Sequence, residues 1–328
     1  MRSIGFSTGA IAKDYFKKAV EISRLQKLDA IELSALRKEE LPGIVDWLKH
    51  PTPAGFSYLS IHAPSRYAPD EEAAIANSLL PAIENGYRVV IHPDAVCQPA
   101  RWRAFGKWLC IENMDKRKPV GRTATELRKI FSKLPEASFC FDIGHARQVD
   151  PTMSAAGEML REFRGRLAQL HVSDVNSSSQ HERLNWCASE SFAKVADLVP
   201  AETPWILETP MNAADSSADR SIQKEIAKAQ SALARLDNWR MVATTIDKKK
   251  AQSSDWPQFV REQLTQPEKM VLILMCCQKV DKKTISTNLG VPADEIDSLL
   301  ESVRRRFELI TGGDKPPTRI PGFTKAAI

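Results

Sequence analysis

Short apolar segments rich in β-forming residues recur along the first 245 residues at intervals of roughly 30 residues, the length of a βα unit. Their nearly continuous apolar character is typical of strands that are buried on both faces of a parallel sheet. The predicted strands are Ser3–Ser7, Ala30–Leu33, Tyr58–His62, Arg88–His92, Trp108–Glu112, Ser138–Asp142, Leu167–His171 and Trp205–Glu208.

Amphipathic stretches with helical spacing separate these strands, for example Ala12–Leu25 and Thr125–Leu134. Eight strands that alternate strictly with helices favour a closed (β/α)₈ barrel over an open sheet. A further helix over Asp219–Leu236 would complete it. The pattern therefore predicts an α/β TIM barrel over residues 1–245.

The remainder of the chain has a different pattern. Residues 246–264 are polar and charged at their start and predict a linker, and residues 265–328 predict a small all-α module with an irregular tail. The expected helices are Glu268–Gln278, Lys282–Asn288 with Asp281 as its N-cap, and Asp294–Ile310. A short helix, a turn at Gly290 and a longer helix are the layout of a helix-turn-helix.

The charges of this module leave its role open. The run Arg304–Arg306 on the third expected helix could meet phosphates of nucleic acid. That helix begins with Asp294, Glu295 and Asp297, however, and acidic side chains at this end oppose docking in a DNA groove. Packing or dimerisation of the module explains the same pattern.

Composition adds limits to this picture. The chain has 328 residues, 43% of them hydrophobic, and a formal net charge of +5, which allows an anionic partner without requiring one. No apolar run reaches the ~20 residues of a membrane span, and the N-terminus lacks the layout of a signal peptide. Six cysteines without a CxxC pair fit a reducing compartment. We therefore expect a cytoplasmic protein of undefined oligomeric state.

Ionisable residues gather at the ends of the predicted strands. His62, His92 and His171 end strands three, four and seven, His145 follows strand six, and His181 lies in the loop after strand seven. Strand carboxylates accompany them: Glu112, Asp142 and Glu208.

All strand ends of a parallel barrel open on one face, so these side chains should meet there. Carboxylates crowded together repel one another unless a cation lies among them. Mixed His and carboxylate ligands suit Zn²⁺, Mn²⁺, Fe²⁺ or Co²⁺, and the residues alone leave the metal and the number of ions open. A lone His in a strand usually has an ordinary structural role, but eight such residues at one rim predict a metal site.

Two further carboxylates have weaker support. Glu32 ends the second strand and could contact a substrate, orient a ligand or pair with a lysine. Asp174 follows His171 by three residues and could orient a ligand from the outside.

At these positions the sequence resembles the xylose-isomerase-like TIM-barrel superfamily, which includes sugar phosphate isomerases/epimerases and endonuclease IV-like AP endonucleases. The resemblance covers the whole barrel in order. It is carried by Ser60–Pro64, Val90–Pro93, Ile111–Met114, Phe141–Ala146, Leu170–Asp174 and Leu207–Pro210.

In the isomerase and epimerase branch, the resemblance implies one divalent ion, Mn, Zn, Fe, Co or Mg. Its ligands would be Glu112, Asp142, His171 and Glu208, and His145 would contact a carbohydrate-like substrate. Glu112 and Glu208 would then remove and return a proton beside a metal-polarised carbonyl.

In the AP endonuclease branch, the resemblance implies three zinc ions. His62, His92, His145 and His181 would supply the additional ligands, while the position of a ninth ligand, an Asp, holds Ser179. The stretch His181–Trp186 also lacks the glycines that both branches often have there.

The resemblance therefore implies a metal-dependent enzyme, with isomerase or epimerase chemistry as the leading hypothesis. The alternatives are a zinc phosphodiesterase acting on DNA, a multinuclear non-haem iron oxidase, and a barrel that has lost catalysis and acts as a sensor. The fold alone does not choose among them, because function depends on the site.

Overall fold

The structure is a computed structural model that describes residues 2–13, 15–35, 37–49, 55–211, 221–230, 232–233, 281–289, 296–297 and 300–301. The chain divides into two compact units, Met1–Asn238 and Trp239–Ile328. Within the described ranges, no helix is long and apolar enough to cross a membrane.

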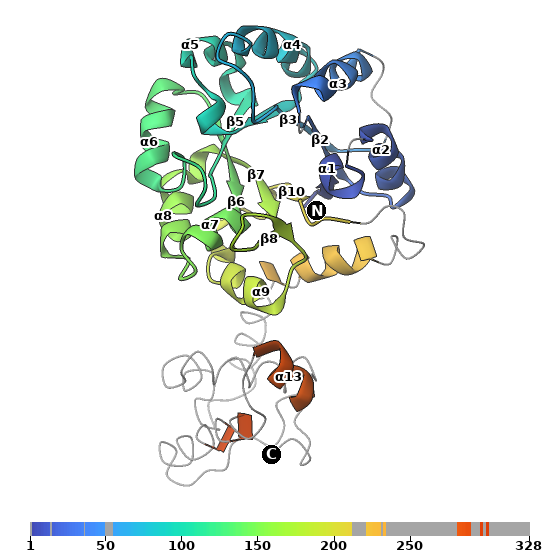
Figure 1. Ribbon diagram of the computed structural model, residues 1–328, viewed down its shortest axis with the longest axis vertical. Helices are drawn as coiled ribbons and strands as arrows, with labels where there is room; N and C mark the ends of the chain where they lie inside the picture. Colours follow the sequence, from blue (N-terminus) through green and yellow to red (C-terminus); the bar gives the residue numbers. More distant parts are fainter. Residues whose placement is uncertain are drawn as a thin grey trace. The chain divides into compact units, whose positions relative to one another are not determined.

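The first unit contains a closed barrel of parallel strands in the order β1-β10-β7-β6-β5-β4-β3-β2 (Figure 1). This confirms the predicted TIM barrel, and every predicted strand is correct to within one residue at either end. The strands are β1 (Ile4–Ser7), β2 (Ala30–Ser34), β3 (Tyr58–His62), β4 (Arg88–Ile91), β5 (Leu109–Glu112), β6 (Ser138–Asp142), β7 (Leu167–Val172) and β10 (Trp205–Leu207).

Helices form a ring outside the strands (Figure 1). They are α1 (Thr8–Ile11), α2 (Phe16–Leu25), α3 (Leu41–Leu48), α4 (Glu72–Glu84), α5 (Pro99–Trp102), α6 (Ala124–Lys133), α7 (Ile143–Val149), α8 (Ser154–Glu162) and α9 (Trp186–Ala193). Residues 221–230 and 232–233 are also helical, within the expected Asp219–Leu236. Short 3₁₀ segments lie at Lys38–Glu40, Pro93–Ala95, Arg103–Trp108, Arg164–Arg166 and Ala196–Leu198.

The predicted helix Ala12–Leu25 is wrong in its first part, because the chain leaves helical geometry there. Helix α1 ends at Ile11, with Ala12 as its C-cap (φ −143°, ψ 81°), and α2 begins at Phe16, after Tyr15 (φ −130°, ψ 63°). The sequence between them contains neither glycine nor proline, the strongest signals of a helix break.

Helix α6 shows how the outer ring is fixed to the barrel. The Thr123 side chain caps its N-terminus by accepting a hydrogen bond from the Glu126 N–H at 3.2 Å. Leu127 and Phe131 are four positions apart and buried, so they share the inner face. The Phe131 ring packs 6.1 Å from the ring of Phe139 on β6. Burying each such side chain stabilises the fold by about 1.5–3 kcal/mol.

On several strands, apolar residues that face the helices alternate with polar or small residues that face the barrel interior, where Val90, Cys110 and Cys140 form a small cluster of their own. On β2, Ile31 and Leu33 belong to the apolar core, while Glu32 between them contacts Gln169 on β7. Strands β1 and β10 lie between β2 and β7 in the closed order, so this contact crosses the interior of the barrel. A polar layer thus lies inside the barrel, below its C-terminal rim.

A small antiparallel hairpin after β7 was not predicted. It consists of β8 (Asp174–Val175) and β9 (His181–Glu182), with Val175 paired to His181. The hairpin turns through Ser179, whose φ of 57° lies in the left-handed region. His181 therefore lies on a strand of this hairpin, whereas the sequence analysis placed it in a loop.

In the second unit, α13 (Lys282–Leu289) matches the predicted helix Lys282–Asn288. The Asp281 side chain accepts from the Thr284 N–H at 2.9 Å, which is the expected N-cap. Residues 296–297 and 300–301 are also helical. The predicted linker at 246–264, the helix Glu268–Gln278 and the run Arg304–Arg306 lie outside the described residues, so the helix-turn-helix arrangement stays a prediction.

The first two strands approach so closely that only glycine fits at position 5. A Cβ atom on Gly5 would lie 1.7 Å from the backbone oxygen of Ala30. We expect Gly5→Ala to lower the free energy of unfolding by at least about 2 kcal/mol, because the clash is with backbone and cannot relax by rotating a side chain. Urea unfolding of the full chain measures this.

The matched control is Gly165→Ala, because no atom lies within 4 Å of a Cβ built there. Its stability should stay close to that of the wild type. Equal stability of the two variants would contradict the predicted close contact between β1 and β2.

Candidate metal centre

The C-terminal rim of the barrel brings together the ionisable residues that the sequence singled out. His62, Glu112 and Asp142 are the last residues of their strands, and His92 and Glu208 directly follow β4 and β10. The remaining members are His171 near the end of β7, His145 in the first turn of α7 and His181 on the hairpin.

These eight side chains form three overlapping groups whose potential ligand atoms lie within 4.8 Å of one another. We call them the first, middle and third cluster. The first cluster is His62, His92 and Glu112; the middle cluster is Glu112, Asp142, His171 and Glu208; the third cluster is Asp142, His145 and His181. Because Glu112 and Asp142 each belong to two clusters, the three form one continuous centre.

Glu112 lies between the first and middle clusters and is 1% exposed. Its Oε2 atom lies 3.1 Å from Nε2 of His62 and 3.3 Å from Nε2 of His92. Its Oε1 atom lies 3.2 Å from Nδ1 of His171 and 3.5 Å from Nδ1 of His145. Both oxygens of this carboxylate are thus occupied by imidazoles of the centre.

Asp142 performs a structural task with one oxygen and leaves the other available. Its Oδ1 atom caps α7 by accepting from the His145 N–H at 2.6 Å. The Asn113 amide fixes its backbone, donating to the Asp142 carbonyl and accepting from the Asp142 N–H, both at 2.8 Å. The buried Oδ2 atom has no hydrogen-bond partner in the described part of the chain.

Neighbouring oxygens orient three of the histidines. Nδ1 of His62 lies 2.9 Å from the carbonyl oxygen of Ala63. Nδ1 of His145 lies 3.0 Å from the Asn113 carbonyl, and Nδ1 of His181 lies 2.7 Å from Oγ of Ser173. A proton held on Nδ1 by such a partner leaves Nε2 free as a ligand atom, as in many metal sites.

The two weaker sequence candidates lie in different places. Glu32 is fully buried inside the barrel, and its Oε2 atom lies 3.2 Å from Nε2 of His171. Asp174 does not contact a histidine of the centre: its side chain accepts from Arg147 at 2.5 Å and from the amide of Asn185. These contacts fasten the base of the hairpin, so any effect of Asp174 on His181 is indirect.

Ser179 leaves the third cluster with three ligands. Its Oγ atom accepts from the Gln148 amide at 2.7 Å, and Arg117 donates to its carbonyl oxygen at 2.8 Å. Both contacts fix the hairpin turn, so the residue that replaces the expected Asp is structural.

Sequence reasoning overlooked Asn113 and Ser173, which orient the ligands Asp142, His145 and His181. Both are polar residues directly beside strand ends within the segments that carried the resemblance. The signal in the sequence was that each follows a candidate ligand by one or two positions. The partner that each contacts could not be deduced from it.

The donor set fits divalent metal ions. Imidazole nitrogens and carboxylate oxygens in groups of three and four match the ligand numbers of Zn²⁺, Fe²⁺ and Mn²⁺ sites. The unpartnered Oδ2 of Asp142 and Nδ1 of His92 are buried polar atoms that the described residues do not satisfy, and such atoms are costly without a partner.

The charges of the centre are perturbed in the absence of an ion. Burial raises the pKa of Glu208 to about 8, with the carboxylates of Glu112 and Asp142 adding to the effect. Burial opposes the charged form of His62, but the adjacent Glu112 outweighs it and raises the pKa of His62 to about 9. Burial, reinforced by His145, lowers the pKa of His181 to about 4. Glu208 and His62 thus retain protons where cations would otherwise neutralise the centre.

Known structures resemble the barrel. Endonuclease IV from Thermus thermophilus shares 20% sequence identity over 70% of this chain and 99% of its own, with a TM-score of 0.48. A protein named as a sugar phosphate isomerase/epimerase from Anabaena variabilis shares 12% identity over 68% of this chain and 88% of its own, with a TM-score of 0.47.

A xylose isomerase domain protein from Alicyclobacillus acidocaldarius shares 10% identity over 73% of this chain and 98% of its own, with a TM-score of 0.45. No family model and no curated protein matches the chain. The closed parallel barrel itself establishes the predicted TIM-barrel fold. What the centre does has to be argued from its own residues.

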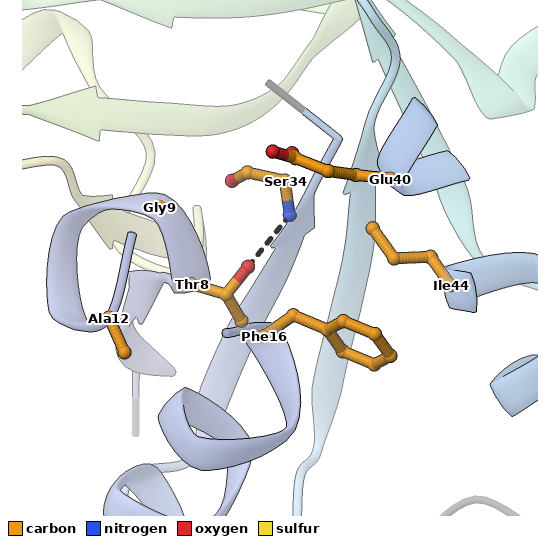
Figure 2. Close-up of a pocket in the computed structure, with 7 residues that line it drawn as sticks. All are labelled: Thr8, Gly9, Ala12, Phe16, Ser34, Glu40 and Ile44. Carbon is orange, nitrogen blue, oxygen red and sulfur yellow. Dashed lines mark hydrogen bonds between the residues drawn. The ribbon is translucent and has the colours of Figure 1, made fainter. Parts of the chain in front are cut away.

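A separate hollow lies beside α1 and is not part of the metal centre. Figure 2 shows its lining, with the hydroxyl of Thr8 accepting a hydrogen bond from the Ser34 N–H at 2.9 Å. Apart from Glu40 the lining side chains are small or apolar, and none of the eight residues of the centre contributes to it.

Protonation of the metal-free centre predicts a pH dependence of metal binding. At pH 7, Glu208 with its pKa of about 8 and His62 with its pKa of about 9 hold protons that a cation must displace. We therefore expect zinc binding to release protons at pH 7, and zinc affinity to rise with pH through the pKa values of Glu208 and then His62, levelling off only above about pH 9. Isothermal titration in buffers of different ionisation enthalpy measures this release.

Glu208→Gln is the matched variant, because its amide cannot titrate and one released proton should disappear. His181 contributes no proton at neutral pH, since its pKa of about 4 leaves it uncharged. Zinc affinity that stays constant from about pH 6 to about pH 9 would show that these two groups are not displaced by the ion.

Proposed function

We propose that the centre binds three divalent ions and hydrolyses a phosphodiester. The observation that carries this proposal is the sharing of Glu112 and Asp142 among three clusters. A single ion would need only the middle cluster, and His62, His92, His145 and His181 would then not act together as metal ligands at the rim. Adjacent ions that share carboxylates are typical of enzymes that transfer or hydrolyse phosphate groups.

The contacts of Glu112 also oppose the leading hypothesis from the sequence. An isomerase would use Glu112 and Glu208 to exchange protons with a substrate. Glu112 is 1% exposed, and its two oxygens face four imidazole rings. A carboxylate enclosed in this way has no oxygen left for a substrate, which favours a bridging role between two ions.

The expected charge of the loaded centre suits an anionic substrate. Three divalent ions would bring six positive charges to three carboxylate ligands, Glu112, Asp142 and Glu208. The buried Glu32 adds one more negative charge, since its pKa is lowered by His171 despite burial. The remaining positive charge would attract a phosphate group more strongly than a neutral sugar.

The side chains of the centre would have different roles in this reaction. When bound, divalent ions supply Lewis acidity and lower the pKa of a water molecule. His181 and Glu208 have exposed side-chain fractions of 30% and 14%, so they border the side from which substrate enters. Glu208 is the carboxylate at this side, and its oxygen that is not bound to an ion would accept a proton of the attacking water. The water oxygen then bonds to phosphorus, the ester P–O bond breaks, and the leaving oxygen takes a proton from solvent.

One observation favours a second candidate. The middle cluster alone offers four ligands from four different strands, which is enough for a single ion. A carbohydrate isomerase or epimerase that uses only this ion therefore stays the alternative. In that case the first and third clusters would not participate in the chemistry.

Removal of the first cluster distinguishes the two functions. We expect His62→Ala and His92→Ala each to reduce the number of bound zinc ions from three to two. Each should also lower the hydrolysis of bis(p-nitrophenyl) phosphate by at least about 100-fold, since an ion that polarises the phosphate is lost. Elemental analysis and release of nitrophenolate measure both effects.

The outcomes separate the candidates. A wild-type chain that holds one ion, exchanges substrate protons with deuterated water and tolerates His62→Ala would support the isomerase and contradict the hydrolase. Protein that retains two or three iron atoms and consumes dioxygen would indicate an oxidase. The solvent-exposed Glu158→Gln on α8 serves as a control that should leave metal content and hydrolysis unchanged.

A further inference from the structure

Glu32 is the one carboxylate of the described barrel interior that belongs to none of the three clusters yet touches a member of the centre. Its side chain is 0% exposed, so it cannot contact a substrate, which removes one of the roles expected from the sequence. It lies on β2, and its partner His171 lies on β7 across the barrel interior. Two fully buried ionisable groups from opposite sides of the barrel are thus in contact, and the purpose of this contact needs an explanation.

Three polar side chains fix the position of Glu32. Its Oε2 atom accepts from Oγ of Ser60 at 2.9 Å and from the Gln169 amide at 2.7 Å, and it lies 3.2 Å from Nε2 of His171. The hydroxyl of Tyr58 donates to Oε1 of Gln169 at 2.5 Å. This contact orients the Gln169 amide so that its nitrogen faces Glu32.

The His171 ring is oriented in the opposite sense to the other histidines. His62, His145 and His181 have Nδ1 beside a backbone or hydroxyl oxygen, which leaves Nε2 as the possible ligand atom. In His171, Nε2 faces Glu32, and Nδ1 faces the centre, 3.2 Å from Glu112 and 3.5 Å from Glu208. His171 can therefore ligate an ion only if Nδ1 has no proton.

A neutral His171, the form that can ligate an ion, has two possible proton positions. Nε2 could donate to Glu32, or it could accept from the Gln169 amide nitrogen, which lies 2.8 Å away. The second arrangement puts the proton on Nδ1 and prevents ligation. The first gives a hydrogen bond to an ionised carboxylate, which is about twice as strong as a bond between neutral groups.

We propose that Glu32 positions His171 for metal binding: by accepting the Nε2 proton it keeps Nδ1 available to the ion of the middle cluster. This inference depends on the metal centre put forward in the proposed function. The residue acts through His171 and has no contact with the ion or the substrate. Carboxylates that orient a ligating histidine in this way raise its basicity and fix its ring.

Zinc binding to the full chain tests the proposal. The variants are Glu32→Ala, which removes the acceptor, and Glu32→Gln, which retains an acceptor oxygen without the charge. Competition with a chromophoric chelator should show one of three zinc ions weakened about 10–100-fold in Glu32→Ala and less in Glu32→Gln. The other two ions should be weakened less, and only through the carboxylates that they share with the middle cluster, because His171 belongs to that cluster alone.

Two controls separate positioning from general damage to the barrel. Ser60→Ala removes one of the hydrogen bonds that hold the same Glu32 oxygen but keeps the carboxylate beside His171, so the middle ion should be weakened less than in Glu32→Ala. Glu72→Gln alters a second fully buried carboxylate, one that accepts from Trp102 Nε1 away from the centre. It should lower the thermal stability of the metal-free protein and leave zinc affinity unchanged.

Nuclear magnetic resonance of ¹⁵N-histidine provides a readout that a structural role would not change. In the zinc-loaded wild type, His171 should carry its proton on Nε2. If Glu32→Ala does not fold, Glu32→Gln provides the test, because loss of the charge should weaken the signal of the Nε2 proton. Three ions bound with wild-type affinity in both Glu32 variants would overturn the inference. A wild type that binds no zinc would instead overturn the metal centre itself.

Discussion

The repulsion among buried carboxylates is the constraint on which the rim of this barrel depends. Glu112 and Asp142 are almost completely buried, and Glu208 is nearly so. In a medium of low dielectric constant, such groups either keep protons or share cations. Glu112 lies among four imidazoles, and its pKa is lowered despite burial by the charge of His171 and by hydrogen bonds from His171, His62 and His92. These rings also carry the nitrogen atoms that ions would use, so the side chains that stabilise the metal-free carboxylate are also the candidate ligands.

The barrel topology turns this local balance into a reproducible geometry. Parallel strands deliver their last residues to one rim, and the hydrogen-bond register fixes the height of each. Asp142 on β6 is paired with His171 on β7, and Glu112 on β5 is paired with Cys140 on β6. His145 and His181 lie outside this strand register and are held in position by other contacts. Asp142 places His145 by capping α7, and the unexpected hairpin places His181.

The barrel and the residues that meet at its rim could be predicted from the sequence, because both follow from periodic signals. Eight apolar runs defined the strands, and a side chain at the end of a run has only one face of the barrel to occupy. The break in Ala12–Leu25 and the hairpin that carries His181 could not be predicted, since neither has a glycine or proline signal or a periodic pattern. The contacts of Asp174 could not be deduced from the sequence either: its side chain accepts from Arg147 and Asn185 at the base of the hairpin that carries His181.

The number of ions was open at the sequence level for a related reason. Strand order places residues on a rim, but sharing of a ligand depends on side-chain rotamers and on which atom faces which neighbour. Glu112 turns one oxygen toward the first cluster and one toward the middle cluster, and Asp142 uses one oxygen for α7 while the other has no hydrogen-bond partner among the described residues. An ion in the middle cluster would therefore fix both shared carboxylates for its neighbours. Binding of the three proposed ions should be coupled through these two side chains, because each ion would reduce the repulsion and the rotational freedom that the next one must overcome.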